Sequence, residues 1–254
     1  MPDPSGRATI VPPLIGLAHG SRHPRTAADV DELLAAVAGL KPGLTAVPAY
    51  LDLTEPDLPT SVTALGASAA VVVPLLFTAA FHVQVDVPAA VRDSGNGTDL
   101  LVAEHLGLGE PVLQALVARA RTTGIDDDRE ILLLAVGSSD EAANAAVGEL
   151  AQRWAARRAG PVRAAFATSA PRASDLLAVP GFSGAVVPLF VASGLLLDAT
   201  AKRAQPRGVP VAAPLGTLLA PLVLDRYDRA VRAARSSGPA GPRHGQSPET
   251  VKKL

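Results

Sequence analysis

The sequence has 254 residues, a formal net charge of −1, no cysteine, and 48% hydrophobic but only 3% aromatic residues. This composition excludes disulfides and iron–sulfur clusters, and it provides neither the basic surface nor the stacking aromatics of nucleic-acid-binding proteins. No apolar run approaches the roughly 18 residues that span a bilayer, and the polar, proline-rich start lacks a signal-peptide core, so we expect a soluble cytoplasmic protein without membrane partners.

Strands and helices are predicted to alternate along the first half of the chain. Residues 71–76 form an apolar run without polar alternation, which is typical of a strand buried on both faces. Apolar residues recur at helical spacing over 26–38, with acidic residues between them. The elements predicted here are strands over 10–18, 45–53, 69–76 and 100–103, and helices over 26–38, 56–65, 89–93 and 111–121.

The second half repeats this order after the polar segment TTGIDDDR. Its longest helix carries Trp154 on the apolar face. Alternating strands and helices predict an α/β fold in which parallel sheets are built from βαβ units. The elements predicted here are strands over 130–136, 162–168, 185–191 and 209–212, and helices over 142–158, 174–178, 199–204 and 218–234.

Two stretches of the first half recur in the second. VVVPLLFTAAFHVQVDVP at 71–88 corresponds to VVPLFVASGLLLDA at 186–199, and LIGLAHGSR at 14–22 corresponds to LLLAVGSSD at 132–140, at nearly the same offset. A repeat of this length indicates two tandem, similar domains, each a small parallel sheet flanked by helices. The predicted division is a disordered start at 1–9, a first domain at 10–121, a linker at 122–129, a second domain at 130–235 and a disordered tail at 236–254.

Two histidines occur in the first copies and are absent from the second. His19 follows the first predicted strand and faces Val136, while His82 follows the third strand. Ligands of parallel sheets bind beyond the carboxyl ends of the strands, so both imidazoles are expected at one edge. Two neutral imidazoles suit Fe²⁺, Co²⁺, Ni²⁺ or Zn²⁺, and the small Gly20 lets a substrate approach. The alternative for His19 is a loop histidine that only hydrogen-bonds the backbone.

Acidic and basic residues accompany the two histidines. Asp52 ends the second predicted strand between apolar neighbours, where a carboxylate is costly unless it belongs to a site; Glu55 is the rival carboxylate. Asp86 either orients His82 or caps the following helix, and the persistence of Asp198 in the second half favours the cap. Arg22, His23 and Arg25 either meet a polyanionic substrate or form a solvated helix start.

With AHGSR at 18–22, AYLDLTEPDLP at 49–59 and VVVPLLFTAAFHVQVDVP at 71–88, the chain resembles the class II tetrapyrrole chelatases of the CbiX/SirB type. The second half resembles the degenerate duplicate of the long forms. The resemblance implies a chelatase-like, flavodoxin-type fold with an active cleft between the domains. It also implies metal ligands and proton acceptors at His19, His82 and Asp52, where relatives commonly have Glu. It further implies that Gly20, Ser21, Arg22 and Thr78 contact the substrate and that Asp86 orients His82.

The function implied by this resemblance is insertion of Fe²⁺ or Co²⁺ into sirohydrochlorin or a related tetrapyrrole, for sirohaem or cobalamin synthesis. The metal is then a substrate, no permanently bound cofactor is expected, and the duplication makes a monomer plausible. The alternatives are a non-catalytic tetrapyrrole or metal carrier, motivated by the shorter acid at Asp52, and a purely structural domain in which both histidines are incidental.

Overall fold

The computed structural model describes residues 11–78, 86–94 and 97–236. Its first sheet has four parallel strands in the order β2-β1-β3-β4, and β1 lies at the centre with Leu14 paired to both Ala46 and Val71. All carboxyl ends therefore point to one edge. The strands are β1 (Leu14–Ala18), β2 (Ala46–Tyr50), β3 (Ala69–Pro74) and β4 (Asp99–Val102).

The central strands are buried on both faces, as the apolar run at 71–76 predicts. Leu14 and Val71 point into one hydrophobic cluster, while Ile15 and Val72 point into another on the opposite face of the sheet. Side chains alternate between the faces of a strand, so an uninterrupted apolar run supplies both layers. Four helices cover these faces: α1 (Thr26–Leu40) and α8 (Ala220–Ser236) on one, and α2 (Leu58–Leu65) and α3 (Val87–Asp93) on the other.

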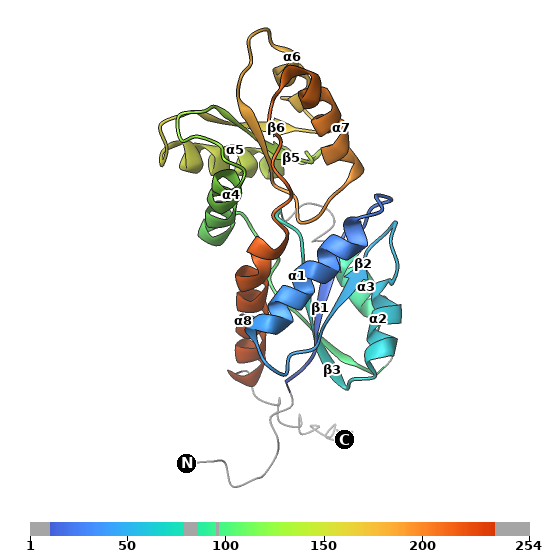
Figure 1. Ribbon diagram of the computed structural model, residues 1–254. Helices are drawn as coiled ribbons and strands as arrows, with labels where there is room; N and C mark the ends of the chain where they lie inside the picture. Colours follow the sequence, from blue (N-terminus) through green and yellow to red (C-terminus); the bar gives the residue numbers. More distant parts are fainter. Residues whose placement is uncertain (1–10, 79–85, 95–96, 237–254) are drawn as a thin grey trace, which may run out of the picture.

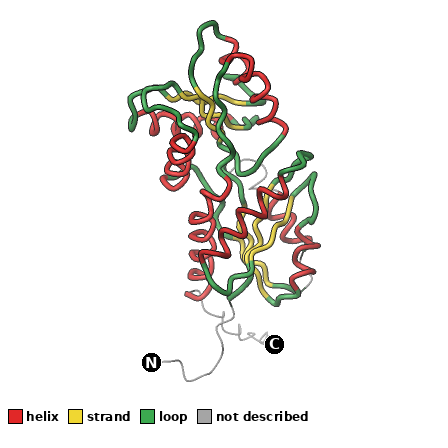
Figure 2. The backbone as a smooth tube through the Cα atoms, in the orientation of Figure 1, coloured by secondary structure: helices red, strands yellow, loops and turns green. Residues whose placement is uncertain are grey.

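The second sheet has three parallel strands in the order β6-β5-β7, which is the order of β2-β1-β3 in the first sheet. Figure 2 shows both sheets enclosed by helices. Trp154 is 2% exposed and lies in the core, as its position on the predicted apolar face requires. The elements of this half are β5 (Ile131–Ala135), α5 (Glu141–Ala155), β6 (Val162–Phe166), α6 (Ala173–Ala178), β7 (Ala185–Pro188) and α7 (Leu195–Ala204), followed by the 3₁₀ turns η2 (Gln205–Arg207) and η3 (Gly216–Leu219).

The last helix of each half packs on the sheet of the other half. α4 (Glu110–Thr122) follows the first sheet in sequence but contacts β7, and Arg153 of α5 donates to the Leu108 carbonyl just before α4. α8 follows the second sheet but packs against α1, β3 and β4 (Figure 1). The predicted boundaries divide the sequence at the linker and stay a prediction; the packing adds an exchange of helices that they do not describe.

The two halves share one hydrophobic cluster because of this exchange. Leu14 and Val73 from the first sheet and Leu133 and Val187 from the second belong to the same set of buried contacts. The tandem α/β fold with two parallel sheets is thus confirmed, and the halves are not separate cores joined by a tether.

One predicted strand is wrong. Residues 209–212 form a single parallel bridge, Val186 with Val211, in place of a strand. Proline has no N–H to donate, so Pro210 and Pro214 interrupt any ladder in this segment. The predicted disordered start at 1–9 and the tail beyond Ser236 lie outside the described residues. Within the part of the chain that is described, no helix is long and apolar enough to cross a membrane.

Candidate functional site

The loops after β1 and β2 lie side by side at the carboxyl edge of the first sheet. The Asp52 amide donates to the His19 carbonyl at 3.0 Å, and the Leu51 amide donates to the Ala18 carbonyl at 3.0 Å. The hydrogen-bonding ladder therefore continues past the strands. Two of the three predicted ligands, His19 and Asp52, are brought to adjacent backbone positions, as the parallel topology predicts.

Gly20 makes this close approach possible. Its φ is +92°, and a Cβ built on it would lie 1.8 Å from the Asp52 carbonyl oxygen. Only glycine combines that backbone conformation with that contact. The role of Gly20 in the structure is thus to let the two loops meet, in addition to the predicted room for a substrate.

Ser21 and Thr54 join the same two loops through a reciprocal pair of hydrogen bonds. The Ser21 amide donates to Thr54 Oγ1 at 2.9 Å, and the same hydroxyl donates to the Ser21 carbonyl at 2.9 Å. Sequence reasoning missed Thr54, and only its place two residues after Asp52 signalled it. Arg22, the residue after Ser21, is exposed.

Asp52 is exposed and lies in a hollow of about 340 Å³. Its Oδ1 accepts a hydrogen bond from the Leu53 amide at 2.8 Å, and Leu53 has φ of +63°. A left-handed conformation is unusual for a leucine and places its side chain, 44% exposed, beside the hollow. The lining residues are Tyr50, Leu51, Asp52, Leu53, Thr54, Glu55 and Asp57.

The rival carboxylate Glu55 belongs to the start of α2. Its Oε2 accepts from the Asp57 amide at 3.2 Å, and Asp57 caps the helix by accepting from the Thr60 amide at 2.9 Å. That bond from Thr60 holds the pKa of Asp57 below its ordinary value. Both carboxylates thus have local roles at the start of α2, whereas Asp52 belongs to the loop whose backbone is bonded to that of His19.

Tyr50 lines the hollow but is a packing residue. Its side chain is 2% exposed, and its hydroxyl has no hydrogen-bond partner among the described residues. Burial, with a smaller contribution from the charge of Asp31, raises the pKa of Tyr50 to about 12. The phenol therefore keeps its proton through the physiological range.

His82, the third predicted ligand, lies outside the described residues. On either side of the gap, Thr78 is half-buried and Asp86 immediately precedes α3. Although Asp86 occupies the N-cap position, its side chain makes no capping hydrogen bond within the described helix, so the capping alternative is wrong. The described residues alone contain no group of three His, Asp or Glu side chains placed to hold a metal.

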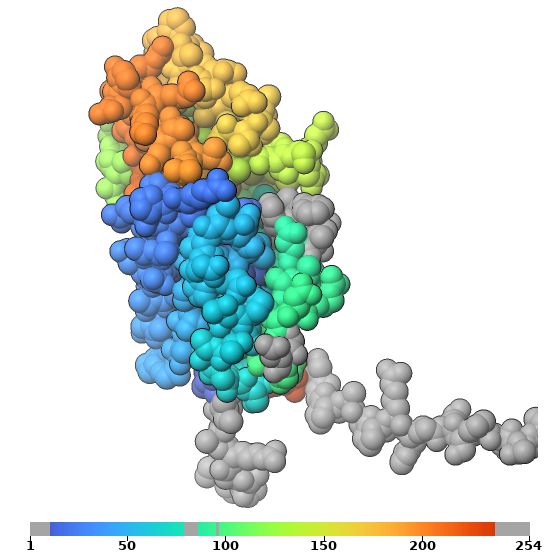
Figure 3. Space-filling view, turned by 90° about the vertical axis from the view of Figure 1, so that its right-hand side faces the viewer, coloured from blue at the N-terminus to red at the C-terminus, as the bar shows by residue number. Residues whose placement is uncertain are grey.

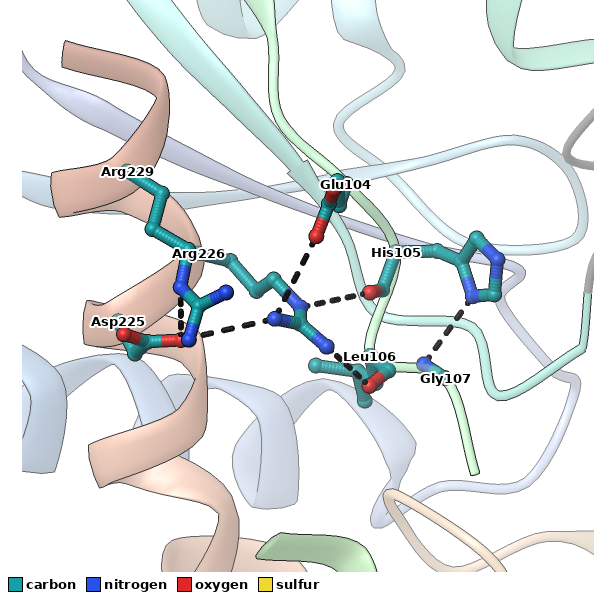
Figure 4. Close-up of polar contacts among 7 residues, drawn as sticks. All are labelled: Glu104, His105, Leu106, Gly107, Asp225, Arg226 and Arg229. Atoms are coloured by element: carbon teal, nitrogen blue, oxygen red, sulfur yellow. Dashed lines mark hydrogen bonds and ion pairs between the residues drawn. The ribbon is translucent and has the colours of Figure 1, made fainter. Parts of the chain in front are cut away.

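Sequence reasoning also missed His105, in the loop after β4 (Figure 4). Its Nδ1 accepts from the Gly107 amide at 3.1 Å, and burial lowers its pKa although a backbone hydrogen bond with Leu76 opposes this. Arg226 of α8 donates to the His105 carbonyl at 2.9 Å and to the Leu106 carbonyl at 3.1 Å. His105 therefore bonds the segment that follows β3, at Leu76, and this segment leads to His82. The signal in the sequence was the position of His105 just after the fourth predicted strand.

His23 has neither of the roles left open for it by the sequence. Its side chain is 10% exposed, and its Nε2 lies 3.1 Å from Oδ2 of Asp198 in α7. Arg25, in contrast, is 67% exposed and pairs with Asp29 at 3.2 Å, which fits a solvated helix start. The histidine thus contacts the second half of the molecule directly.

Comparisons with known proteins agree with this architecture. Residues 13–123 match the family model CbiX. The chain is 31% identical over 146 residues to a sirohydrochlorin ferrochelatase of Priestia megaterium, covering 53% of each chain. It is 30% identical over 74 residues to a sirohydrochlorin cobaltochelatase of Sulfolobus acidocaldarius, covering 28% of this chain and 60% of that protein. The chain therefore spans little more than half the length of these curated relatives.

Solved structures show the same fold. The sirohydrochlorin chelatase SirB from Bacillus subtilis subspecies spizizenii, in complex with cobalt, matches with a TM-score of 0.70 at 20% identity and covers 92% of this chain and 98% of that one. CbiX, described as the terminal enzyme of sirohaem biosynthesis in denitrifying bacteria, matches with a TM-score of 0.63 at 22% identity, covering 87% and 99%. At these identities the likeness concerns the fold, which is the predicted chelatase-like pair of sheets.

Proposed function

We propose that this protein, whose residues 13–123 match the family model CbiX, inserts Fe²⁺ or Co²⁺ into sirohydrochlorin or a related tetrapyrrole. The observation that carries the proposal is the contact between the His19 and Asp52 loops at the carboxyl edge of the sheet, where the Asp52 amide donates to the His19 carbonyl at 3.0 Å. The names of the two curated relatives support this reaction, and they include both metals.

In the proposed mechanism His19, His82 and Asp52 receive the divalent ion. Imidazole nitrogens and a carboxylate oxygen accept either Fe²⁺ or Co²⁺, so this donor set does not choose between them. As the metal enters the macrocycle, two pyrrole N–H groups each lose a proton, and a histidine together with Asp52 accepts these protons. The product is the neutralised metallo-tetrapyrrole core plus two protons released to solvent.

Substrate contacts are proposed at the neighbouring loop and beyond β3. Gly20 and Arg22 offer backbone N–H groups to the acidic arms of the macrocycle, Arg22 also offers its guanidinium, and Ser21 and Thr78 offer hydroxyls. Asp86 is proposed to orient His82. We further propose that the protein acts as a monomer in the cytoplasm, which size-exclusion chromatography with light scattering and fractionation of cells check.

An anaerobic absorbance assay tests the proposal. Sirohydrochlorin is mixed with Co²⁺ or Fe²⁺ in the presence of native protein, His19→Ala, or Val136→Ala as the matched control at the equivalent position of the second half. We expect native protein and Val136→Ala to accelerate insertion, and His19→Ala to lose about 100-fold or more, since a positioned acid–base group contributes 10²–10⁴-fold. No acceleration by native protein overturns the proposal.

The second candidate is a tetrapyrrole or metal carrier. It is favoured by one observation, that the short acid Asp52 already accepts a hydrogen bond from the Leu53 amide at 2.8 Å. Asp52→Glu restores the family's usual acid and separates the two functions. Turnover by native protein supports the chelatase; a bound-pigment spectrum without turnover, with turnover restored in Asp52→Glu, supports the carrier.

A further inference from the structure

A cluster of hydrogen bonds joins the start of α1 to the loop and first turn of α7. His23 Nε2 contacts Asp198 Oδ2 at 3.1 Å, and the Thr26 hydroxyl donates to the Ser193 carbonyl at 2.8 Å. The Ser193 amide in turn donates to Asp29 Oδ2 at 2.7 Å. In Figure 3 the blue atoms of the first half abut the orange atoms of the second where these elements meet. We call this cluster the junction.

The junction is mostly shielded from solvent on the side of the first half. The side chains of His23 and Asp29 are 10% and 12% exposed, and Thr26 is 5% exposed, whereas Asp198 is 48% exposed. Hydrogen bonds protected from water hold their geometry better than exposed ion pairs do. The groups that His23, Thr26 and Asp29 contribute to the junction are therefore shielded from water.

The backbone selects one tautomer of His23. The Arg25 amide donates to His23 Nδ1 at 3.2 Å, so this nitrogen is the acceptor. In the neutral ring the proton then resides on Nε2, which donates it to Asp198. The ring is held at both nitrogens, one by its own helix start and one by the second half.

Further hydrogen bonds lead from His23 to the proposed site. The His23 amide donates to Ser21 Oγ at 3.1 Å, and the Ser21 backbone is bonded to Thr54 Oγ1 in both directions at 2.9 Å. The loop held in this way carries His19, whose carbonyl accepts from Asp52. A continuous series of hydrogen bonds thus leads from the carboxylate of Asp198 through His23 and Ser21 to the loops of His19 and Asp52.

We propose that His23 and Asp198 are positioning residues, a latch through which the second half holds the His19 loop in its reactive geometry. The proposal rests on the proposed function and gives the second half a role there. Residues 130–235 contain no histidine, so this half supplies no counterpart of His19 or His82. A misplacement of about 1 Å is enough to cost 10²-fold in an enzyme, so a latch at this distance from the reacting groups has a measurable effect.

A matched pair of substitutions separates the two bonds of the ring. In His23→Asn the side-chain oxygen keeps an acceptor near the position of Nδ1 but does not reach Asp198. In His23→Gln the terminal amide reaches the position of Nε2 and keeps a donor for Asp198. Lys202→Ala, one turn further along α7 and not bonded to His23, is the control.

We expect His23→Asn and Asp198→Ala each to lower kcat for metal insertion about tenfold and to weaken Co²⁺ binding, while the KM for the tetrapyrrole and the melting temperature stay unchanged. His23→Gln and Lys202→Ala stay within about threefold of native protein. The double variant His23→Asn with Asp198→Ala is no worse than either single variant, because the two residues act through one bond. Equal loss in His23→Gln, or losses that follow the melting temperature, overturn the latch.

Hydrogen exchange of residues 19–25 provides a readout that needs no turnover. We expect exchange in this segment to speed up at least threefold in His23→Asn and Asp198→Ala and to be unchanged in His23→Gln. If native protein inserts no metal, the proposed function fails while this measurement still tests the latch. Unchanged exchange in all variants overturns the latch whatever the activity.

Discussion

The carboxyl edges of the two sheets have the same backbone and different side chains. At the first edge the Asp52 amide donates to the His19 carbonyl at 3.0 Å; at the second the Thr168 amide donates to the Val136 carbonyl at 2.9 Å. The glycine that follows has φ of +92° in one case and +95°, at Gly137, in the other. The framework of the proposed site is thus a property of the fold, and it exists where no histidine does.

The second edge uses its polar side chains to bond its own loop. Thr168 Oγ1 donates to the Val136 carbonyl at 2.8 Å, and Asn144 both accepts from the Ser138 amide at 3.0 Å and donates to its carbonyl at 2.8 Å. At the first edge Asp52 takes the position of Thr168, and His19 takes the position of Val136. The two edges therefore share a frame and differ in the side chains at these two positions, where the first edge carries an imidazole and a carboxylate and the second a valine and a threonine.

The largest expected effect comes from adding a methyl group at each glycine. Gly20→Ala places Cβ 1.8 Å from the backbone oxygen of Asp52, whereas the nearest atoms to a Cβ in Gly137→Ala are side-chain oxygens, those of Ser169 at 2.5 Å and Thr168 at 2.9 Å, followed by the Ser169 amide nitrogen at 3.1 Å. We expect Gly20→Ala to lower the free energy of unfolding by about 3 kcal/mol and Gly137→Ala by about 1 kcal/mol. Urea denaturation of both variants measures this; equal losses would contradict the different roles of the two glycines.

A slightly smaller effect is expected at the exchanged helix α8. Arg226 is 15% exposed and donates to the carbonyls of His105 and Leu106 (Figure 4). Removing a charged donor from buried carbonyls costs about 2 kcal/mol, so Arg226→Ala should lower the free energy of unfolding by that amount. Arg229→Ala is the control on the same helix: Arg229 is 59% exposed, pairs with Asp225 at 2.8 Å, and should change stability by less than about 0.5 kcal/mol.

The junction makes the stability of the two halves depend on pH. Burial acts to raise the pKa of Asp29, but hydrogen bonds from Ser193 and Arg25 outweigh it and lower the pKa below the ordinary value of 3.8. A depressed carboxyl pKa stabilises the folded state above the ordinary pKa, and this contribution is lost as pH falls through the folded pKa. Urea denaturation between pH 3 and 6 should show a stability advantage over Asp29→Asn at the upper end that shrinks towards pH 3; parallel curves would refute it.

The smallest effect is expected where the second edge is given a histidine. Val136 is 44% exposed, so Val136→His should change the free energy of unfolding by no more than about 0.5 kcal/mol. The variant should also bind no additional Co²⁺, because Thr168 occupies the position of Asp52 and provides no carboxylate there. Calorimetric titration with Co²⁺ checks this; a second, native-like binding event would show that the frame alone is sufficient.

The amino-acid sequence predicted the frame because the frame depends on local patterns. Uninterrupted apolar runs produced buried strands, and the parallel order placed His19 and Asp52 at one edge. The strand predicted over 45–53 is too long. The observed strand ends at Tyr50, and the chain continues as the loop of Asp52 and Leu53. The apolar residues there resemble a strand, and the positive φ of Leu53 has no sequence signal.

Three features depended on contacts between distant segments. His105 bonds the backbone of Leu76, Thr54 bonds the backbone of Ser21, and His23 bonds Asp198 across the two halves. A histidine or threonine in a loop has many possible partners, and the pattern of residue types does not choose among them. The sequence could therefore propose a solvated helix start or a substrate contact for His23, but not the junction.

By itself, the sequence determined the duplication, the two parallel sheets, and the edge on which His19 and Asp52 lie. Only the tertiary structure decided that α4 and α8 exchange sheets and that His23, four residues after His19, contacts Asp198 of the second half. The physical reason is that an amphipathic period defines which face of a helix is buried, whereas the sheet that buries it is chosen by chain connection and by the fit of side chains from far along the sequence.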